Sequence, residues 1–229
     1  MKLFGTEITQ KRIAFFAIFA VAALVLSQIK FDAILGVQNK NFTFFQLIGP
    51  TAAGVLGPFL GVASVLFVEI SNSLITGASF DPLAIVLLLP MAFAALYFGS
   101  KDRLTAIPAL VCMALFWMHP YGAQVWFYSL YWLIPVACAF HKDNIIARAL
   151  GSTFTAHAIG SVAYLYAFNL APAVWLSLIP VVAFERLTFA AGIVVSFYAI
   201  NTAVDLITAK TGFKFANIEK HYSLAHGIA

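Results

Sequence analysis

The chain has 229 residues, of which 62% are hydrophobic and only 10% are charged, and its formal net charge is +4. Soluble domains carry about 25% charged residues, so this composition excludes a soluble globular domain and predicts an all-α, polytopic integral membrane protein. In such a protein an excess of Lys and Arg is typical of cytoplasmic loops and does not indicate binding to nucleic acid. We expect a single transmembrane domain over residues 1–229, placed in the lipid bilayer of the cell membrane.

The first predicted membrane span covers residues 13–29 and follows a basic segment, residues 1–12, which we expect to be cytoplasmic. The apolar run resembles a signal peptide, but no small-residue cleavage site follows it, so we predict that it is retained as a span. A polar connection over residues 30–41 comes next.

The apolar segment over residues 42–76 contains the dipeptide Gly-Pro twice, at Gly49–Pro50 and at Gly57–Pro58. Proline removes a helix hydrogen bond and restricts the residue before it, whereas glycine tolerates the unusual backbone conformations that result. We therefore predict a short helix that ends near Gly57 and a second helix with Pro58 in its first turn. A single tilted and kinked span is the alternative.

Loop charges predict the topology. A loop over residues 71–81 follows the broken segment, and a polar, basic tail closes the chain. Further spans are predicted from apolar runs over residues 82–98, 104–118, 124–140, 148–168 and 172 to about 207, and the tail covers residues 208–229. The positive-inside rule places the basic loops and both termini in the cytoplasm only if the broken segment crosses an even number of times. The prediction is about six full spans plus a broken Gly-Pro hairpin.

Charged side chains inside membrane segments are costly, and each one indicates a candidate functional site. Glu69 and Asn72 lie three residues apart near the end of the second half of the hairpin, which places them on one helix face. Glu185 and Arg186 are adjacent and diverge by about 100° around a helix, so we expect them not to pair with each other. Glu69 is then the candidate partner of Arg186. A helix-packing or interfacial ion pair is the alternative.

The predicted topology places several polar and aromatic side chains on the outer side of the membrane, where they would form a pocket open to the outside. The candidate substrate-binding residues are Glu69, Asn72, Glu185, Arg186, His119 and Trp126. For most of the aromatic residues, an aromatic belt at the level of the lipid headgroups is the alternative.

His157 lies in the middle of a predicted span, where it could act as a ligand or as a proton-relay group. A histidine that is hydrogen-bonded to a neighbouring helix is the alternative. In the same span Gly151, Thr155 and Gly160 are small residues of the kind that favour close helix packing, either within the chain or with a partner chain.

The sequence contains no P-loop, no H-E-x-x-H motif and no G-x-S-x-G motif. We therefore predict that the chain is not an enzyme, needs no cofactor and holds no metal ion. Cys112 and Cys138 lie in apolar runs and are expected to be packing residues.

The run over residues 47–77 resembles the second and third helices of substrate-binding S components of energy-coupling factor (ECF) vitamin transporters. The similarity rests on Leu56, Gly57, Pro58 and Gly61 at the start of a helix, followed by Glu69 and Asn72 near its end. The resemblance implies six helices, cytoplasmic termini and an outward-facing vitamin pocket. It also implies that separate ATPase subunits and a coupling membrane subunit supply the energy.

These observations predict a membrane-embedded solute-binding or transport subunit that takes up a small organic molecule such as a vitamin. Two alternatives stay open. One is a scaffold whose small-residue stripes bind a partner membrane protein. The other is a proton-coupled secondary carrier that uses His157 or Glu69 as its proton site.

Overall fold

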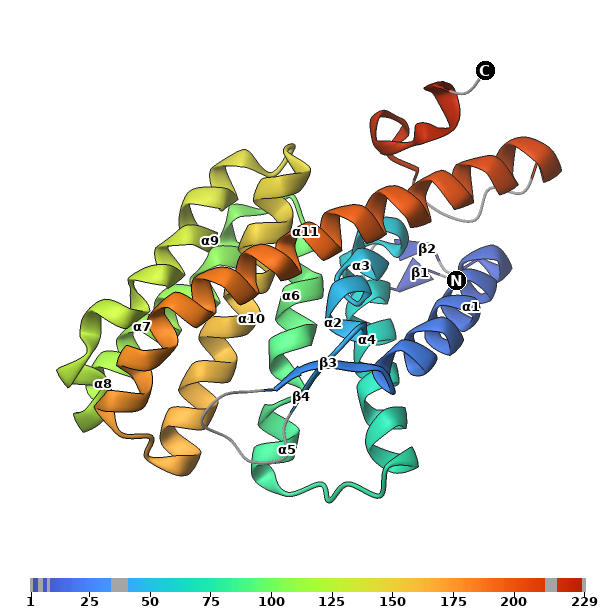
Figure 1. The fold of residues 1–229 in the computed structure, drawn as a ribbon. Helices are drawn as coiled ribbons and strands as arrows, with labels where there is room; N and C mark the ends of the chain where they lie inside the picture. Colours follow the sequence, from blue (N-terminus) through green and yellow to red (C-terminus); the bar gives the residue numbers. More distant parts are fainter. Residues whose placement is uncertain (1, 4–5, 8, 34–40, 213–217, 228–229) are drawn as a thin grey trace.

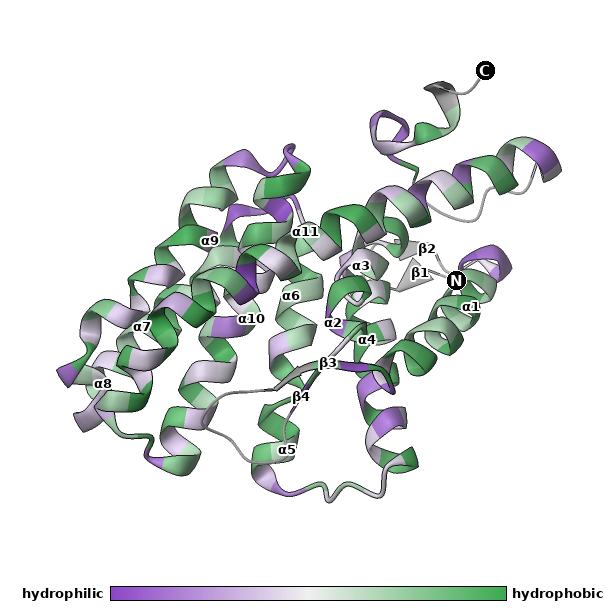
Figure 2. Cartoon of the chain, viewed as in Figure 1, coloured by the Kyte–Doolittle hydropathy of each residue, from purple (hydrophilic) through white to green (hydrophobic). Residues whose placement is uncertain are grey.

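The computed structural model describes residues 2–3, 6–7, 9–33, 41–212 and 218–227, and these residues are almost entirely helical (Figure 1). Four helical segments in this part of the chain are long and apolar enough to cross a membrane. They are α1 (Gln10–Ser27), α4 (Pro58–Ile75), the segment Pro82–Gly99 and α11 (Pro172–Thr211). Hydrophobic residues cover most of their length (Figure 2), and Ile18, Val21 and Val195 are exposed side chains of the kind that contact lipid. The number of spans and their orientation stay predictions.

The N-terminal region contains two short strand pairs on either side of α1. Strands β1 (Lys2–Leu3) and β2 (Thr6–Glu7) pair antiparallel before α1, and β3 (Lys30–Ala33) and β4 (Asn41–Thr43) pair antiparallel after it. Thr9 caps α1 by accepting a hydrogen bond from the main-chain N–H of Arg12, so the helix begins three residues before the predicted span. The helix also ends two residues before the end of that span. The middle of the predicted polar connection, residues 34–40, lies outside the described residues.

The broken Gly-Pro segment forms a helical hairpin. Helices α2 (Phe45–Ile48) and α3 (Thr51–Leu56) continue each other, because Gly49 and Pro50 keep helical dihedral angles. Gly57, with φ 86° and ψ 162°, ends α3, and Pro58 occupies the first turn of α4. A side chain at Gly61 would collide with the main chain of Ala53, so the segments before and after Gly57 lie against each other. With about 18 Å of length, α2 and α3 together are shorter than the roughly 30 Å hydrocarbon core.

The loop predicted over residues 71–81 begins later in the structure. Helix α4 continues through Asn72 to Ile75, where the hydroxyl of Thr76 donates to the main-chain carbonyl of Asn72 at 2.9 Å and closes the last turn. Ser71, Asn72 and Ser73 are residue types that favour turns and helix caps, which is consistent with a predicted loop that begins at residue 71. In the fold they continue the helix.

The next predicted span, residues 82–98, consists of two helices, α5 (Pro82–Val86) and α6 (Leu89–Gly99). Asp81 caps α5 by accepting a hydrogen bond from Ala84 N at 2.8 Å. Pro90 has no N–H to donate to the preceding turn, which explains the interruption before α6. Helix α6 packs against α3, α4 and α10 (Figure 1), so it lies at the centre of the bundle.

The predicted span over residues 124–140 is not one α-helix. After the 3₁₀ helix η1 (Arg103–Ala106) and α7 (Ile107–Met118), the chain forms four short elements. These are α8 (Pro120–Gln124), the 3₁₀ helix η2 (Trp126–Trp132), α9 (Leu133–Cys138) and the 3₁₀ helix η3 (Ala139–His141). The indole of Trp117 donates to the carbonyl of Trp126 at 3.1 Å and to the hydroxyl of Ser129 at 2.7 Å. These contacts, and the missing N–H of Pro135, favour the tighter and interrupted conformation.

Two long helices complete the bundle. Helix α10 (Ile145–Phe168) begins three residues before the predicted span, because the side chain of Asn144 caps it by accepting from Ile146 N at 2.8 Å. Helix α11 has 40 residues and continues through Pro180, Glu185 and Arg186 without ending. Its length is about 60 Å, and its C-terminal end reaches beyond the neighbouring helices (Figure 1).

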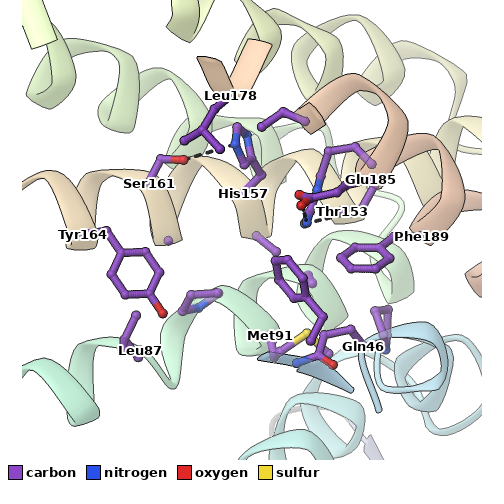
Figure 3. Close-up of a pocket in the computed structure, with 18 of the residues that line it drawn as sticks. Gln46, Leu87, Met91, Thr153, His157, Ser161, Tyr164, Leu178, Glu185 and Phe189 are labelled. Carbon is purple, nitrogen blue, oxygen red and sulfur yellow. Dashed lines mark hydrogen bonds and ion pairs between the residues drawn. The ribbon is translucent and has the colours of Figure 1, made fainter. Parts of the chain in front are cut away.

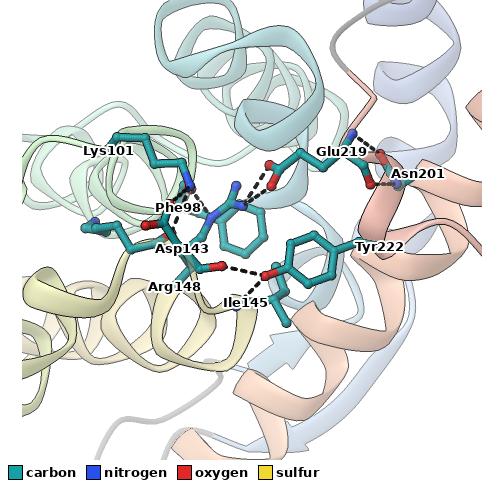
Figure 4. Close-up of polar contacts among 9 residues, drawn as sticks. Phe98, Lys101, Asp143, Ile145, Arg148, Asn201, Glu219 and Tyr222 are labelled. Atoms are coloured by element: carbon teal, nitrogen blue, oxygen red, sulfur yellow. Dashed lines mark hydrogen bonds and ion pairs between the residues drawn. The ribbon is translucent and has the colours of Figure 1, made fainter.

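The C-terminal tail folds back onto the start of α10 and onto α11 (Figure 4). Its described part contains the 3₁₀ turns η4 (Lys220–Tyr222) and η5 (Leu224–Gly227), whereas residues 213–217 and 228–229 lie outside the described residues. The buried Arg148 of α10 donates to both carboxylate oxygens of Glu219, at 2.7 and 3.0 Å. Asn201 of α11 bonds to the main-chain N–H and C=O of Glu219, at 3.1 and 2.8 Å. The tail was expected as a polar segment, and the structure makes it part of the packed fold.

Two basic side chains cap the C-terminal end of α6. Lys142 Nζ donates to the carbonyl of Tyr97 at 2.7 Å and lies 3.1 Å from the centre of the Tyr97 ring. Arg148 Nε donates to the carbonyl of Phe98 at 3.0 Å. The last carbonyls of a helix have no partner within it, so these two donors satisfy acceptors that would otherwise be unpaired. Burial, with a contribution from the nearby Arg148 guanidinium, lowers the pKa of Lys142 from 10.5 to about 7.

We expect the protein to become more stable as the pH rises from about 7 to 10.5, because of Lys142. Between these values the folded state has released the Lys142 proton while the unfolded state still binds it, and stability rises with pH wherever the unfolded state binds more protons. Melting temperatures in detergent, measured at several pH values for wild type and Lys142→Met, test this. The rise should be smaller in Lys142→Met, and an identical rise in both proteins would contradict the assignment.

Candidate solute-binding site

A cavity of about 290 Å³ lies inside the helical bundle (Figure 3). Helices α10 and α11 and the start of α6 form one part of its wall, and β4, α2, α4 and η2 contribute further residues. Its polar and charged lining residues are Asn41, Gln46, Glu69, Tyr128, Thr153, His157, Ser161, Tyr164, Glu185 and Arg186. A concave space with converging polar groups is the usual form of a small-molecule site.

The one ion pair at the cavity joins two consecutive residues of α11, as far as the described residues show. Arg186 Nη2 lies 3.2 Å from Glu185 Oε2, and both side chains are buried. The expectation that they would not pair is wrong, because the long arginine side chain reaches back although the two Cα–Cβ directions diverge. The Arg186 guanidinium also lies over two rings, with its Cζ 4.2 Å from the centre of Phe189 and 5.0 Å from that of Phe42. Such contacts stabilise a cation that has left water.

Glu69 lines the same cavity from α4. The sequence predicted Glu69 as the partner of Arg186, but Arg186 forms an ion pair with Glu185. Glu69 Oε2 is buried and has no hydrogen-bond partner among the described residues. A buried polar atom without a partner is costly, and such an atom in a native fold needs an explanation. A bound group that donates a hydrogen bond to Glu69 Oε2 is one such explanation.

Gln46 reaches the cavity from α2 (Figure 3). Its Oε1 accepts hydrogen bonds from the main-chain N–H of Thr43 at 2.7 Å and from the Thr43 hydroxyl at 2.9 Å. These two bonds fix the orientation of the amide. The short strand β4, which contains Thr43, therefore positions a polar group of the site.

His157 is held by three hydrogen bonds from neighbouring residues. The indole N–H of Trp132 lies 3.1 Å from Nδ1, and the hydroxyls of Tyr128 and Ser161 lie 3.0 and 3.2 Å from Nε2. The indole N–H can only donate, so Nδ1 accepts and the ring proton resides on Nε2. This arrangement defines a neutral histidine that presents an Nε2–H donor, which matches the alternative of a histidine bonded to its neighbours.

Three of the six candidate binding residues lie away from the cavity. Asn72 accepts hydrogen bonds from Gln28 at 2.7 Å and from Ser27 at 3.2 Å, and so joins α4 to α1. His119 caps α8 and bonds through Nε2 to the side chain of Asn169 at 3.2 Å. Trp126 is half exposed and stacks edge to face with its neighbour in the chain. Glu69, Glu185 and Arg186 are brought together at the cavity wall.

The small residues of α10 have different environments. A side chain at Gly151 would collide with the ring of Tyr97, so this glycine permits close approach of α6 and α10. The hydroxyl of the buried Thr155 donates to the carbonyl of Gly151 at 2.7 Å. Gly160 lines the cavity, and a Cβ there would meet only Pro90, at 3.9 Å. Gly160 therefore leaves space open.

The sequence interpretation missed a polar stripe on α10. Thr153, His157 and Ser161 are spaced by four residues, which places them on one helix face, and all three line the cavity (Figure 3). The spacing was available in the sequence. Tyr128 and Trp175, which also line the cavity, are hidden there among many other aromatic residues.

Comparison of the chain with protein-family models, with curated proteins and with solved structures found no match.

Proposed function

We propose that the protein is a membrane-embedded solute-binding subunit that takes up a small organic molecule such as a vitamin, in the manner of the S components of ECF transporters. A coupling membrane subunit and ATPase subunits are the proposed partners, and the cell membrane is the proposed location with both termini in the cytoplasm. The observation that carries the proposal is the cavity, because it encloses charged, polar and aromatic groups within a bundle of membrane-length helices.

Filling the cavity tests this proposal. Gly160→Leu adds bulk where the wall leaves room, so the protein should fold while the bound solute is lost. Ala167→Leu places the same leucine side chain at an exposed position of the same helix and should have no effect. Native mass spectrometry in mild detergent, followed by identification of the released molecule, measures occupancy in both variants and in wild type.

Each outcome has a clear meaning. A stoichiometric solute in wild type and Ala167→Leu that disappears in Gly160→Leu supports the proposal. A solute retained by Gly160→Leu would place binding elsewhere. A protein that carries a partner chain and no solute would favour the scaffold interpretation.

Glu69 Oε2, which has no hydrogen-bond partner among the described residues, also favours a second candidate function, a proton-coupled carrier, because a buried carboxyl can take up and release protons during transport. His157 is less suited to this role, since its three hydrogen bonds fix its tautomer. Uptake that depends on a proton gradient, measured in liposomes that contain this chain alone, would support the carrier. Its absence there, with uptake restored by energising subunits, would support the solute-binding subunit.

A further inference from the structure

The charges of the described lining residues do not cancel when Glu69 is ionised. Among the described lining residues the charged side chains are Glu69, Glu185 and Arg186. Arg186 and Glu185 form an ion pair at 3.2 Å and compensate each other. His157 contributes no charge, because its Nδ1 accepts the indole N–H of Trp132. An ionised Glu69 therefore leaves the described wall with one negative charge in excess.

The cavity wall is also rich in aromatic rings. Phe42 and Phe189 already hold one cation, the guanidinium of Arg186, over their faces. Tyr128, Tyr164 and Trp175 line the remaining space. The face of an aromatic ring attracts a cation, and the attraction is strongest where water is excluded.

We propose that the solute is an organic cation with one positive charge, whose protonated or quaternary nitrogen is bound by the carboxylate of Glu69 and by the aromatic wall. This inference rests on the proposed solute-binding function. The bound cation supplies the partner that Glu69 Oε2 lacks among the described residues. An anionic solute would instead compete with Glu185 for Arg186, the one arginine at the described wall, and would face the charge of Glu69.

The polar stripe of α10 receives the uncharged part of the solute. Ser161 and Tyr164 contribute hydroxyl groups from this helix, and His157 Nε2 lies 3.2 Å from the Ser161 hydroxyl (Figure 3). The volume of about 290 Å³ limits the solute to a compact molecule. A carboxylate in one part of the wall and neutral hydrogen-bonding groups in another would orient such a molecule.

Three probes with one shared framework test the inference, namely 4-phenylbutylamine, 4-phenylbutanol and 4-phenylbutyrate. Their binding to the full chain in detergent is measured by calorimetry and by the change in tryptophan fluorescence, to which Trp175 at the cavity contributes. We expect the amine to bind about 10- to 100-fold more tightly than the alcohol or the acid, the range expected for a hydrogen bond to a charged group. Glu69→Gln keeps the shape of the side chain and should reduce the amine to the affinity of the alcohol.

The controls separate this inference from the proposed function. If the alcohol or the acid binds as tightly as the amine and Gly160→Leu abolishes binding, the cavity binds a solute but the inference of a cation is wrong. Equal binding by Glu69→Gln and wild type, with Gly160→Leu inactive, would show a neutral solute beside a protonated Glu69 and would also overturn it. Binding that Gly160→Leu does not change, or no binding of any probe together with an empty purified protein, would contradict both.

Discussion

Glu219→Ala is expected to destabilise the folded protein by about 3 kcal/mol, the lower end of the range for breaking a buried ion pair. The substitution leaves the guanidinium of Arg148, whose side chain is 2% exposed, without the carboxylate that lies 2.7 Å from it. It also weakens the attachment of the tail, which Asn201 and Tyr222 would then hold alone among the contacts in Figure 4. Chemical or thermal unfolding in detergent, followed by circular dichroism, measures the loss.

Asp143→Ala is the matched control for Glu219→Ala. Asp143 pairs with Lys101 at 2.8 Å, but the two side chains are 100% and 58% exposed. Exposed ion pairs contribute about 0 to 1 kcal/mol, so this substitution should change stability little. Similar losses in the two variants would show that burial of Arg148 does not determine the effect.

Gly61→Val is expected to open the helical hairpin and to destabilise the protein by about 3 kcal/mol or more, above the usual cost of overpacking a core. Overpacking is tolerated when a flexible side chain can move. At this position the added atoms meet the main chain of Ala53, which belongs to the facing helix and cannot move without shifting α3. Since α3 and α4 also form part of the packing around α6, the displacement would extend to the cavity wall.

Gly77→Val provides the comparison for Gly61→Val. Nothing lies within 4 Å of the position that a Cβ would occupy at Gly77, although its φ of 67° makes any side chain mildly strained. We expect a loss of about 1 to 2 kcal/mol there and no effect on solute binding. Unfolding curves and solute occupancy, measured together for both variants, distinguish a hairpin that needs a close contact from a general intolerance of glycine substitution.

Features that depend on a few neighbouring residues were predictable from the sequence. The break at Gly57 follows from local backbone sterics, and Pro58 can begin a helix but not continue one. Apolar runs of sufficient length predicted membrane-length helices without any knowledge of tertiary contacts. The charged residues Glu69, Glu185 and Arg186 were singled out because a charge among apolar residues is costly wherever it lies.

Features that depend on distant partners were not predictable. Asn72 is hydrogen-bonded to Gln28, and His119 is hydrogen-bonded to Asn169. No periodicity in the sequence predicts such pairs. The pairing of Glu185 with Arg186 depends on how far an arginine side chain reaches, which a helical wheel does not describe. The docking of the tail through Glu219 likewise requires knowing that Arg148 of α10 and Asn201 of α11 lie near each other.

Helix α11 is continuous from the cavity to the C-terminal tail. Arg186 at the cavity and Asn201 beneath the tail lie on the same helix, about 22 Å apart, and no proline occurs between Val181 and Thr211. A straight helix transmits tilt along its axis, so a rotation of about 5° around the cavity displaces the tail attachment by about 2 Å. One continuous helix therefore joins the cavity wall to the attachment of the tail.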